Sequence, residues 1–203
     1  MKKIFLIVAV SAILVSCGNN ASTNHHDNMH SGDSMTAHDH AAMENIKTMS
    51  AQFQDVDPVV AGFVKGMLQD YMGIKNALVA DQETDAAKSA GHMHTLMQQF
   101  DKSLLTDAQK KVYEALEEDL AEQAEHISEN NAIDHKRSHF AMMSDDMYGM
   151  VKAFGSGQVL YHDHCPMARD NKGAMWLSET KDIRNPYFGN KMMQCGSVEE
   201  IIQ

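Results

Sequence analysis

The chain has 203 residues and carries 28 acidic side chains against 17 lysines and arginines, so its formal net charge is −11 at neutral pH. Nucleic acid is excluded as a natural partner, because binding to phosphates needs a basic surface. An acidic surface attracts cations instead. The length suits one domain of ordinary size together with an export signal and a tail.

The first residues have the pattern of an export signal. Lys2 and Lys3 precede an apolar run over residues 4–15, which is too short for the roughly 20 residues that span a bilayer. The run ends in Leu14-Val15-Ser16-Cys17, which resembles the lipobox of bacterial lipoproteins. Residues 1–16 are therefore predicted to be a signal peptide, and Cys17 to carry the lipid. An ordinary signal peptide with a chance cysteine is the alternative.

The anchor predicts a cell-envelope protein attached to the lipid membrane through Cys17. Residues 18–20 contain no acidic run, which favours an outer membrane location facing the periplasm. From Cys17 to residue 55 the sequence is polar and poor in large aliphatic residues, so a flexible tether is expected. Histidines and methionines recur along it, and such segments capture metal ions weakly or serve as solvated spacers. They are His25, His26, Met29, His30, Met35, His38, His40, Met43 and Met49.

Residues 56–157 show the periodicity of four helices. The first is expected to begin at Asp57-Pro58, the second to cover residues 84–100, and the third to run from a capping box at Thr106 as far as residue 127. The fourth begins near Asp134 and ends at residues 155–157, which read Gly-Ser-Gly. Short polar links between them predict an up-and-down four-helix bundle.

Residues 158–203 are predicted to form a small irregular α+β lobe that belongs to the same domain as the bundle. Residues 158–161 and 174–177 are β-prone, residues 185–189 have turn composition, and a final helical turn is expected from Ser197. The fold class is thus mainly α, a four-helix bundle with a C-terminal lobe.

This lobe contains the strongest chemical pattern. His162-Asp163-His164-Cys165-Pro166-Met167 and Met192-Met193-Gln194-Cys195 each place a methionine two residues from a cysteine. Thiolates and thioethers are soft ligands that select copper(I). The predicted site combines Cys165 and Cys195 with Met167 and with Met192 or Met193, and His164 or His135 completes the shell.

A structural disulfide between Cys165 and Cys195 is the alternative to a metal site. It would close a loop of 30 residues in an oxidising compartment, and loop entropy gives such a bond on the order of 3 kcal/mol. A pair that switches between a disulfide and a metal site is compatible with both interpretations.

His135 and His139 form a second pattern, because residues four apart share one face of a helix. This is a metal-ligand spacing, although surface histidines show it as well. Met143 and Met147 continue the face, where core packing is the more common reason for methionine.

The lobe also resembles a known group of proteins. Residues 165–168 (CPMA), 173–178 (GAMWLS), 183–189 (IRNPYFG) and 192–196 (MMQCG) resemble an uncharacterised domain family, and the resemblance covers about residues 56–200. The family occurs alone in the envelope of Bacteroidetes-like bacteria and at the C-terminus of periplasmic adaptors of Cus-type copper and silver efflux pumps. The resemblance implies a role in heavy-metal handling, with copper(I) or silver(I) as cargo and an efflux adaptor or pump as partner.

The sequence therefore predicts a metal scavenger or metallochaperone-like lipoprotein without catalytic turnover. No nucleophile–base pair, phosphate loop or nucleotide fingerprint is present to support an enzyme. The second hypothesis is an interaction module that docks on an efflux or envelope partner and uses the cysteines as a disulfide. Thiol–disulfide chemistry is a third and weaker hypothesis, because the cysteines lack Cys-x-x-Cys spacing.

Overall fold

The computed structural model describes residues 46–203. The predicted signal peptide, Cys17 and the tether up to residue 45 lie outside this range. None of the helices within it combines the length and the apolar character that crossing a membrane requires.

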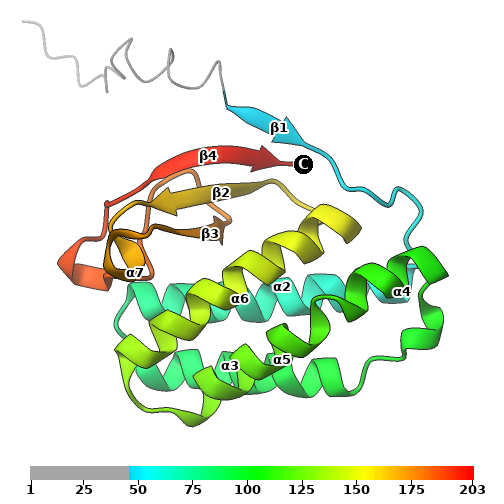
Figure 1. Cartoon of the computed structure of the whole chain (residues 1–203), viewed down its shortest axis with the longest axis horizontal. Helices are drawn as coiled ribbons and strands as arrows, with labels where there is room; N and C mark the ends of the chain where they lie inside the picture. The colour runs from blue at the N-terminus through cyan, green and yellow to red at the C-terminus, as the bar shows by residue number, and fades with distance from the viewer. Residues whose placement is uncertain (1–45) are drawn as a thin grey trace, which may run out of the picture. The chain divides into compact units, whose positions relative to one another are not determined.

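The four predicted helical segments form a closed bundle, which confirms the mainly α fold. They are α2 (Pro58–Val79), α3 (Glu83–Gln98), the pair α4 (Asp107–Glu114) and α5 (Glu117–Glu129), and α6 (Ile133–Phe154). A short 3₁₀ turn, η1 (Lys102–Leu104), precedes α4. Helix α2 contacts α3, α3 contacts α5, α5 contacts α6, and α6 returns to α2 (Figure 1).

The helix ends lie where the local signals predict them. Asp57 accepts a hydrogen bond from the backbone of Val59, and Pro58 opens α2. Thr106 and Gln109 make the reciprocal capping box of α4. Helix α6 ends at Gly155, whose φ of +85° is a conformation that glycine adopts without strain.

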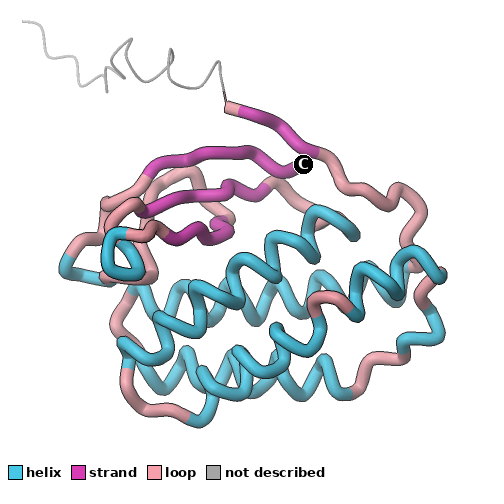
Figure 2. The backbone as a smooth tube through the Cα atoms, viewed as in Figure 1, coloured by secondary structure: helices cyan, strands magenta, loops and turns pink. Residues whose placement is uncertain are grey.

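The third predicted helix is divided into two, because the chain breaks between α4 and α5. Figure 2 shows this break as a short loop inside an otherwise helical stretch. Next to the break, the side chain of Leu116 packs against Gly149 of α6, where an added Cβ would lie only 3.2 Å from a Leu116 methyl carbon. The glycine leaves the space that this leucine fills.

The lobe forms a four-stranded sheet in the order β1-β4-β2-β3. Its strands are β1 (Lys47–Met49), β2 (Leu160–Cys165), β3 (Ala174–Ser178) and β4 (Ser197–Ile202), with the turns α7 (Ala168–Asn171) and η2 (Gly189–Lys191) between them. β2 pairs antiparallel with both β3 and β4, and β1 pairs parallel with β4. The β-prone run at residues 174–177 is confirmed as β3, whereas β2 begins two residues later than the run predicted at residues 158–161 and continues to Cys165.

Two predictions at the sheet were wrong. The residues from Ser197 onward form β4 instead of a helical turn, because β2 and β1 offer backbone partners on both of its edges. The tether was expected to last until residue 55, but residues 47–49 form β1, and Gln52 and Phe53 donate backbone hydrogen bonds to Lys152 and Ala153. Such partners come from residues remote in sequence, so a local pattern does not reveal them.

The sheet covers α2 and α6 on the side away from α3 and α5 (Figure 1). Tyr71 of α2 joins the layers, because its hydroxyl hydrogen-bonds Ser144 of α6 at 2.8 Å and accepts from the backbone N–H of Leu177 in β3 at 3.0 Å. Trp176, fully buried in β3, packs edge-on against Tyr187. Lobe and bundle thus share one core.

Candidate metal centres

The structure brings Cys165 and Cys195 together, as the sequence predicted. Cys165 ends β2 and is fully buried, whereas Cys195 is half-buried in the loop before β4. Their sulfur atoms lie 3.2 Å apart, and both cysteines are free. This distance is longer than the ~2.05 Å of a disulfide and within reach of an S–H···S hydrogen bond.

Asn185 holds the loop that presents Cys195. Its buried side chain donates to the carbonyl oxygen of Cys195 at 2.6 Å and accepts from the backbone N–H of Tyr187 at 2.8 Å. Its backbone N–H donates to the carbonyl of Met193 at 2.8 Å. The turn at residues 185–189 therefore fixes the position of the loop that carries Cys195.

Gly196 allows this loop to approach the sheet. Its φ is +149°, and an added Cβ would lie 2.8 Å from both the carbonyl oxygen of His164 and the ring of Trp176. A larger residue would push the loop, and Cys195 with it, away from β2.

The environment of Cys195 favours its protonated thiol. The hydrogen bond with Cys165, followed by burial, raises the pKa of the Cys195 thiol. A metal ion that binds to Cys195 must therefore displace the proton of its thiol.

The remaining predicted ligands of this site are spread around it. Met167 is 44% exposed and lines a surface hollow with Arg137 and Tyr187, whereas Met193 lines a different hollow with Ile183 and Arg184. Met192 is half-buried in the turn before Cys195.

His164 belongs to a different face of the sheet from Cys165. Neighbouring residues of a strand point to opposite sides, and the ring of His164 lies over Gly173, whose added Cβ would be 2.6 Å from its Nε2 atom. His164 is thus placed apart from the buried thiol.

His135 and His139 lie together as predicted, and His126 of α5 joins them. One ring nitrogen from each of the three histidines lies within 4.8 Å of the other two, and this is the one such group of His, Cys, Asp or Glu within residues 46–203. The ring of His139 stacks on His126 with centroids 4.4 Å apart and lies 4.3 Å from His135. His135 is therefore grouped with histidines and not with the cysteines.

Gln123 orients His139. Its side-chain oxygen lies 2.7 Å from Nδ1 of His139, and Gln123 itself is buried. Burial, with the nearby imidazoles of His135 and His126, lowers the pKa of His139. A neutral ring that donates from Nδ1 keeps the lone pair on Nε2, which is the form that binds a metal ion.

Sequence reasoning missed His126, although a signal for it exists. His126 lies in the last turn of α5, and His135 and His139 lie in the first two turns of α6, with only residues 130–132 between the helices. A short link makes consecutive helices antiparallel neighbours, so the end of one helix faces the start of the next. The short link therefore predicts that the histidines on its two sides lie close together.

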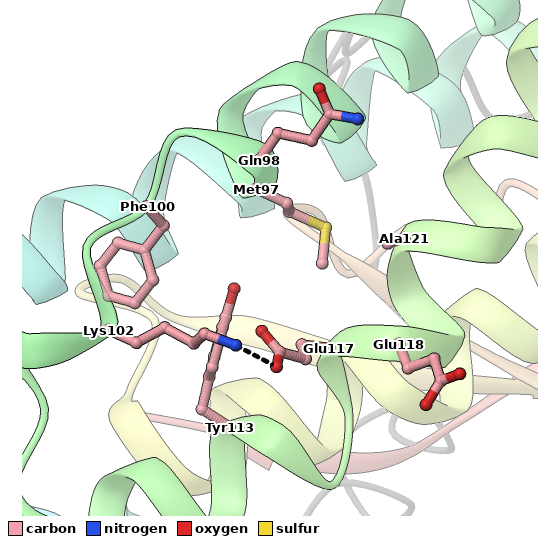
Figure 3. Close-up of a pocket in the computed structure, with 8 residues that line it drawn as sticks. All are labelled: Met97, Gln98, Phe100, Lys102, Tyr113, Glu117, Glu118 and Ala121. Carbon is pink, nitrogen blue, oxygen red and sulfur yellow. Dashed lines mark hydrogen bonds and ion pairs between the residues drawn. The ribbon is translucent and has the colours of Figure 1, made fainter.

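A further hollow lies between the end of α3 and the helices α4 and α5. Figure 3 shows Met97, Phe100 and Tyr113 around this hollow. Lys102 Nζ forms an ion pair with Glu117 Oε1 at 2.6 Å. Lys102 neutralises Glu117, and the carboxylate of Glu118 with the single sulfur of Met97 is a weak ligand set. It adds no third candidate for a metal ion.

Comparison with known proteins gives a family but no activity. No curated protein and no solved structure matches the chain. A family model described as "Protein of unknown function (DUF3347)" matches residues 67–159. The match begins within α2 and ends before β2, so it includes the three clustered histidines and omits both cysteines of the lobe. Residues 67–159 of this chain therefore match an uncharacterised domain family, DUF3347.

Proposed function

We propose that this protein is a lipid-anchored envelope protein that binds copper(I), or silver(I), at Cys165 and Cys195 and stores or delivers it without turnover. The observation that carries the proposal is the pair of free thiols with sulfurs 3.2 Å apart, contributed by segments separated by 30 residues. Two thiolates select soft monovalent ions over magnesium or calcium.

The two cysteine sulfurs must move slightly apart to bind a metal ion. Metal–sulfur bonds of about 2.3 Å in a tetrahedral site place two sulfurs about 3.8 Å apart, and a two-coordinate ion needs a wider separation. Cys165 is fixed within β2, so the loop of Cys195 makes this movement. Each thiol that becomes a ligand releases one proton, and the ion keeps its oxidation state.

Methionine supplies the third ligand in this proposal. Met192 and Met193 lie three and two residues before Cys195 in the same loop. When that loop opens, either thioether can turn toward the ion. The net charge of −11 favours cations near the protein, and the His/Met-rich N-terminal segment adds weaker ligands for capture.

An interaction module is the second candidate function. The closeness of the two sulfurs favours it, because a thiol oxidant of the envelope could remove two electrons and two protons and leave a Cys165–Cys195 disulfide. The protein would then dock on an efflux adaptor or pump through its bundle, and its cysteines would have only a structural role.

An anaerobic copper(I) titration separates these functions. The mature chain with Cys17→Ser serves as the parent, and it competes in reduced form with a coloured copper(I) chelator. Adding Cys165→Ser/Cys195→Ser should abolish one tight equivalent, whereas the parent, which already carries one Cys→Ser change, should retain it. Unchanged competition by the double variant would refute the copper(I) site and leave the interaction module.

The methionines are tested in the same assay. Met192→Leu and Met193→Leu keep the volume of the side chain and remove the thioether, and the one that supplies the third ligand should weaken copper(I) binding tenfold or more. Met142→Leu, at an exposed position of α6, is the matched control and should leave binding unchanged.

A further inference from the structure

We propose that His126, His135 and His139 form a second metal site, which takes a divalent borderline ion such as zinc(II) or copper(II). It differs from the thiol pair in ligand chemistry and position. The proposal depends on its own residues, so it holds or fails independently of copper(I) binding at Cys165 and Cys195.

The geometry needs only side-chain rotation to close around an ion. Metal–nitrogen bonds of 2.0–2.1 Å place tetrahedral ligands about 3.4 Å apart, and the three nitrogens already lie within 4.8 Å of one another. The rings currently stack, with the planes of His126 and His139 inclined by 17°. Turning each ring about its side-chain bonds replaces this stacking by convergence on a central ion.

The helices that carry the three rings are fixed relative to each other. Lys136, next to His135, is buried, and its Nζ donates to the carbonyl oxygen of Ile127 at the end of α5. Asn130 caps the link by accepting from the backbone N–H of Ala132 at 2.8 Å. The backbone of the hairpin is therefore already ordered before an ion binds, which lowers the entropy cost of ordering the three histidines on binding.

One ligand already has the outer-shell partner that metal-binding histidines usually have. Gln123 accepts from Nδ1 of His139 at 2.7 Å and is buried, so it holds the ring with Nε2 available. A stacked pair of surface histidines would not need a buried side chain to fix one ring. This hydrogen bond is the second observation, besides the clustering, that indicates a ligand.

The charge and the donor set define the class of ion. Glu122 places a carboxylate oxygen 3.6 Å from Nε2 of His126, which contributes negative charge beside the cluster. Three imidazoles suit zinc, copper(II) and nickel, and they lack the thiolates that select copper(I). Three protein ligands leave one position of a tetrahedral ion for water or an outside group.

Histidine modification on the unaltered full chain tests the site without any variant. The reduced chain is treated with diethylpyrocarbonate in the presence and absence of one equivalent of zinc(II), and the modified peptides are identified by mass spectrometry. Zinc should slow the modification of His126, His135 and His139 at least tenfold, and leave His92 and His94 of α3 reactive. Equal reactivity of the three with and without zinc would overturn the proposal.

A pair of matched variants gives the affinity. His126→Ala/His139→Ala should remove one tight equivalent of zinc(II) in competition with a coloured chelator. His92→Ala/His94→Ala removes the same number of helical histidines and should not, and weak binding by the N-terminal segment is common to both chains. Equal losses in the two variants would overturn the site. Protection of the three histidines should persist in the Cys165→Ser/Cys195→Ser chain, which separates this result from that of the thiol pair.

Discussion

The cysteine pair and the histidine cluster are built in opposite ways. The cysteines lie 30 residues apart and meet only because Asn185, Gly196 and the sheet hold their loop against β2. The histidines come from a single helix hairpin and lie at or near the surface. A site that depends on the whole lobe is sensitive to the stability of the fold, whereas a site on a hairpin surface exchanges ions with solvent and depends on few neighbours.

The largest difference between the two sites is expected for a substitution at Trp176. This ring is fully buried in β3 and packs against Tyr187, whose turn leads to the Cys195 loop. Trp176→Ala should lower the free energy of unfolding by about 3–5 kcal/mol, because it leaves a large cavity. Urea denaturation measures the change, and copper(I) binding should fall with it. Val59→Ala, at an exposed position, is the control; an equal effect there would contradict this account.

Tyr71→Phe tests whether the sheet depends on its link to the bundle. The variant removes the hydroxyl that joins Ser144 to the backbone N–H of Leu177 and leaves two buried polar groups without this partner. The expected loss of stability is about 1–3 kcal/mol, measured by urea denaturation. Because Leu177 lies next to Trp176, hydrogen exchange should increase in β3 more than around the histidines. Uniform exchange would show that the two regions are not separable.

Asp146 on α6 gives the helical region a pH dependence. Burial, followed by the charges of Asp119 and Asp145, raises the pKa of Asp146 to about 6. An unfolded aspartate titrates near 3.9, so the folded state binds more protons between about pH 4 and pH 6. The free energy of unfolding contributed by this group therefore falls as pH rises through that window and stays low above it.

Asp146→Asn should reverse this loss. At pH 7 the variant should be more stable by about 1 kcal/mol, a value reduced from the full shift because the group is partly solvated. Thermal unfolding at pH 4.5 and pH 7.5 measures the effect, and the variant should show the smaller difference between the two. A variant that is no more stable at pH 7.5 would show that solvent screens these charges.

The smallest effect is expected at His126. Its side chain is exposed and its contacts are a ring stack on His139 and a distant carboxylate, so His126→Ala should change metal-free stability by no more than about 0.5 kcal/mol. Differential scanning calorimetry with chelator present measures it. A large loss would mean that the cluster is part of the core and not a surface site.

Sequence patterns predicted the helices well because their signals are local. The Asp57-Pro58 start, the Thr106–Gln109 capping box and the Gly155 end each involve residues within a few positions of one another. The break between α4 and α5 has no comparable local signal, since it accompanies the packing of Leu116 on Gly149 from another helix.

The candidate sites were predictable only in part for the same reason. The sequence pattern was enough to predict that Cys165 and Cys195 lie close together. The directions of the methionine side chains depend on how the loop folds, so the pattern did not predict them. The pair His135 and His139 follows from helical periodicity, whereas His126 required the neighbouring helix to be considered as well.

Strand β1 has a practical consequence for any shortened form of this protein. It pairs along β4, so its residues cover backbone donors and acceptors that would otherwise form an open edge. A shortened chain that starts at residue 56 would lack β1, so the edge of β4 would be free to pair with another chain. A recombinant domain that begins at residue 46 should stay monodisperse at concentrations where the shorter one self-associates.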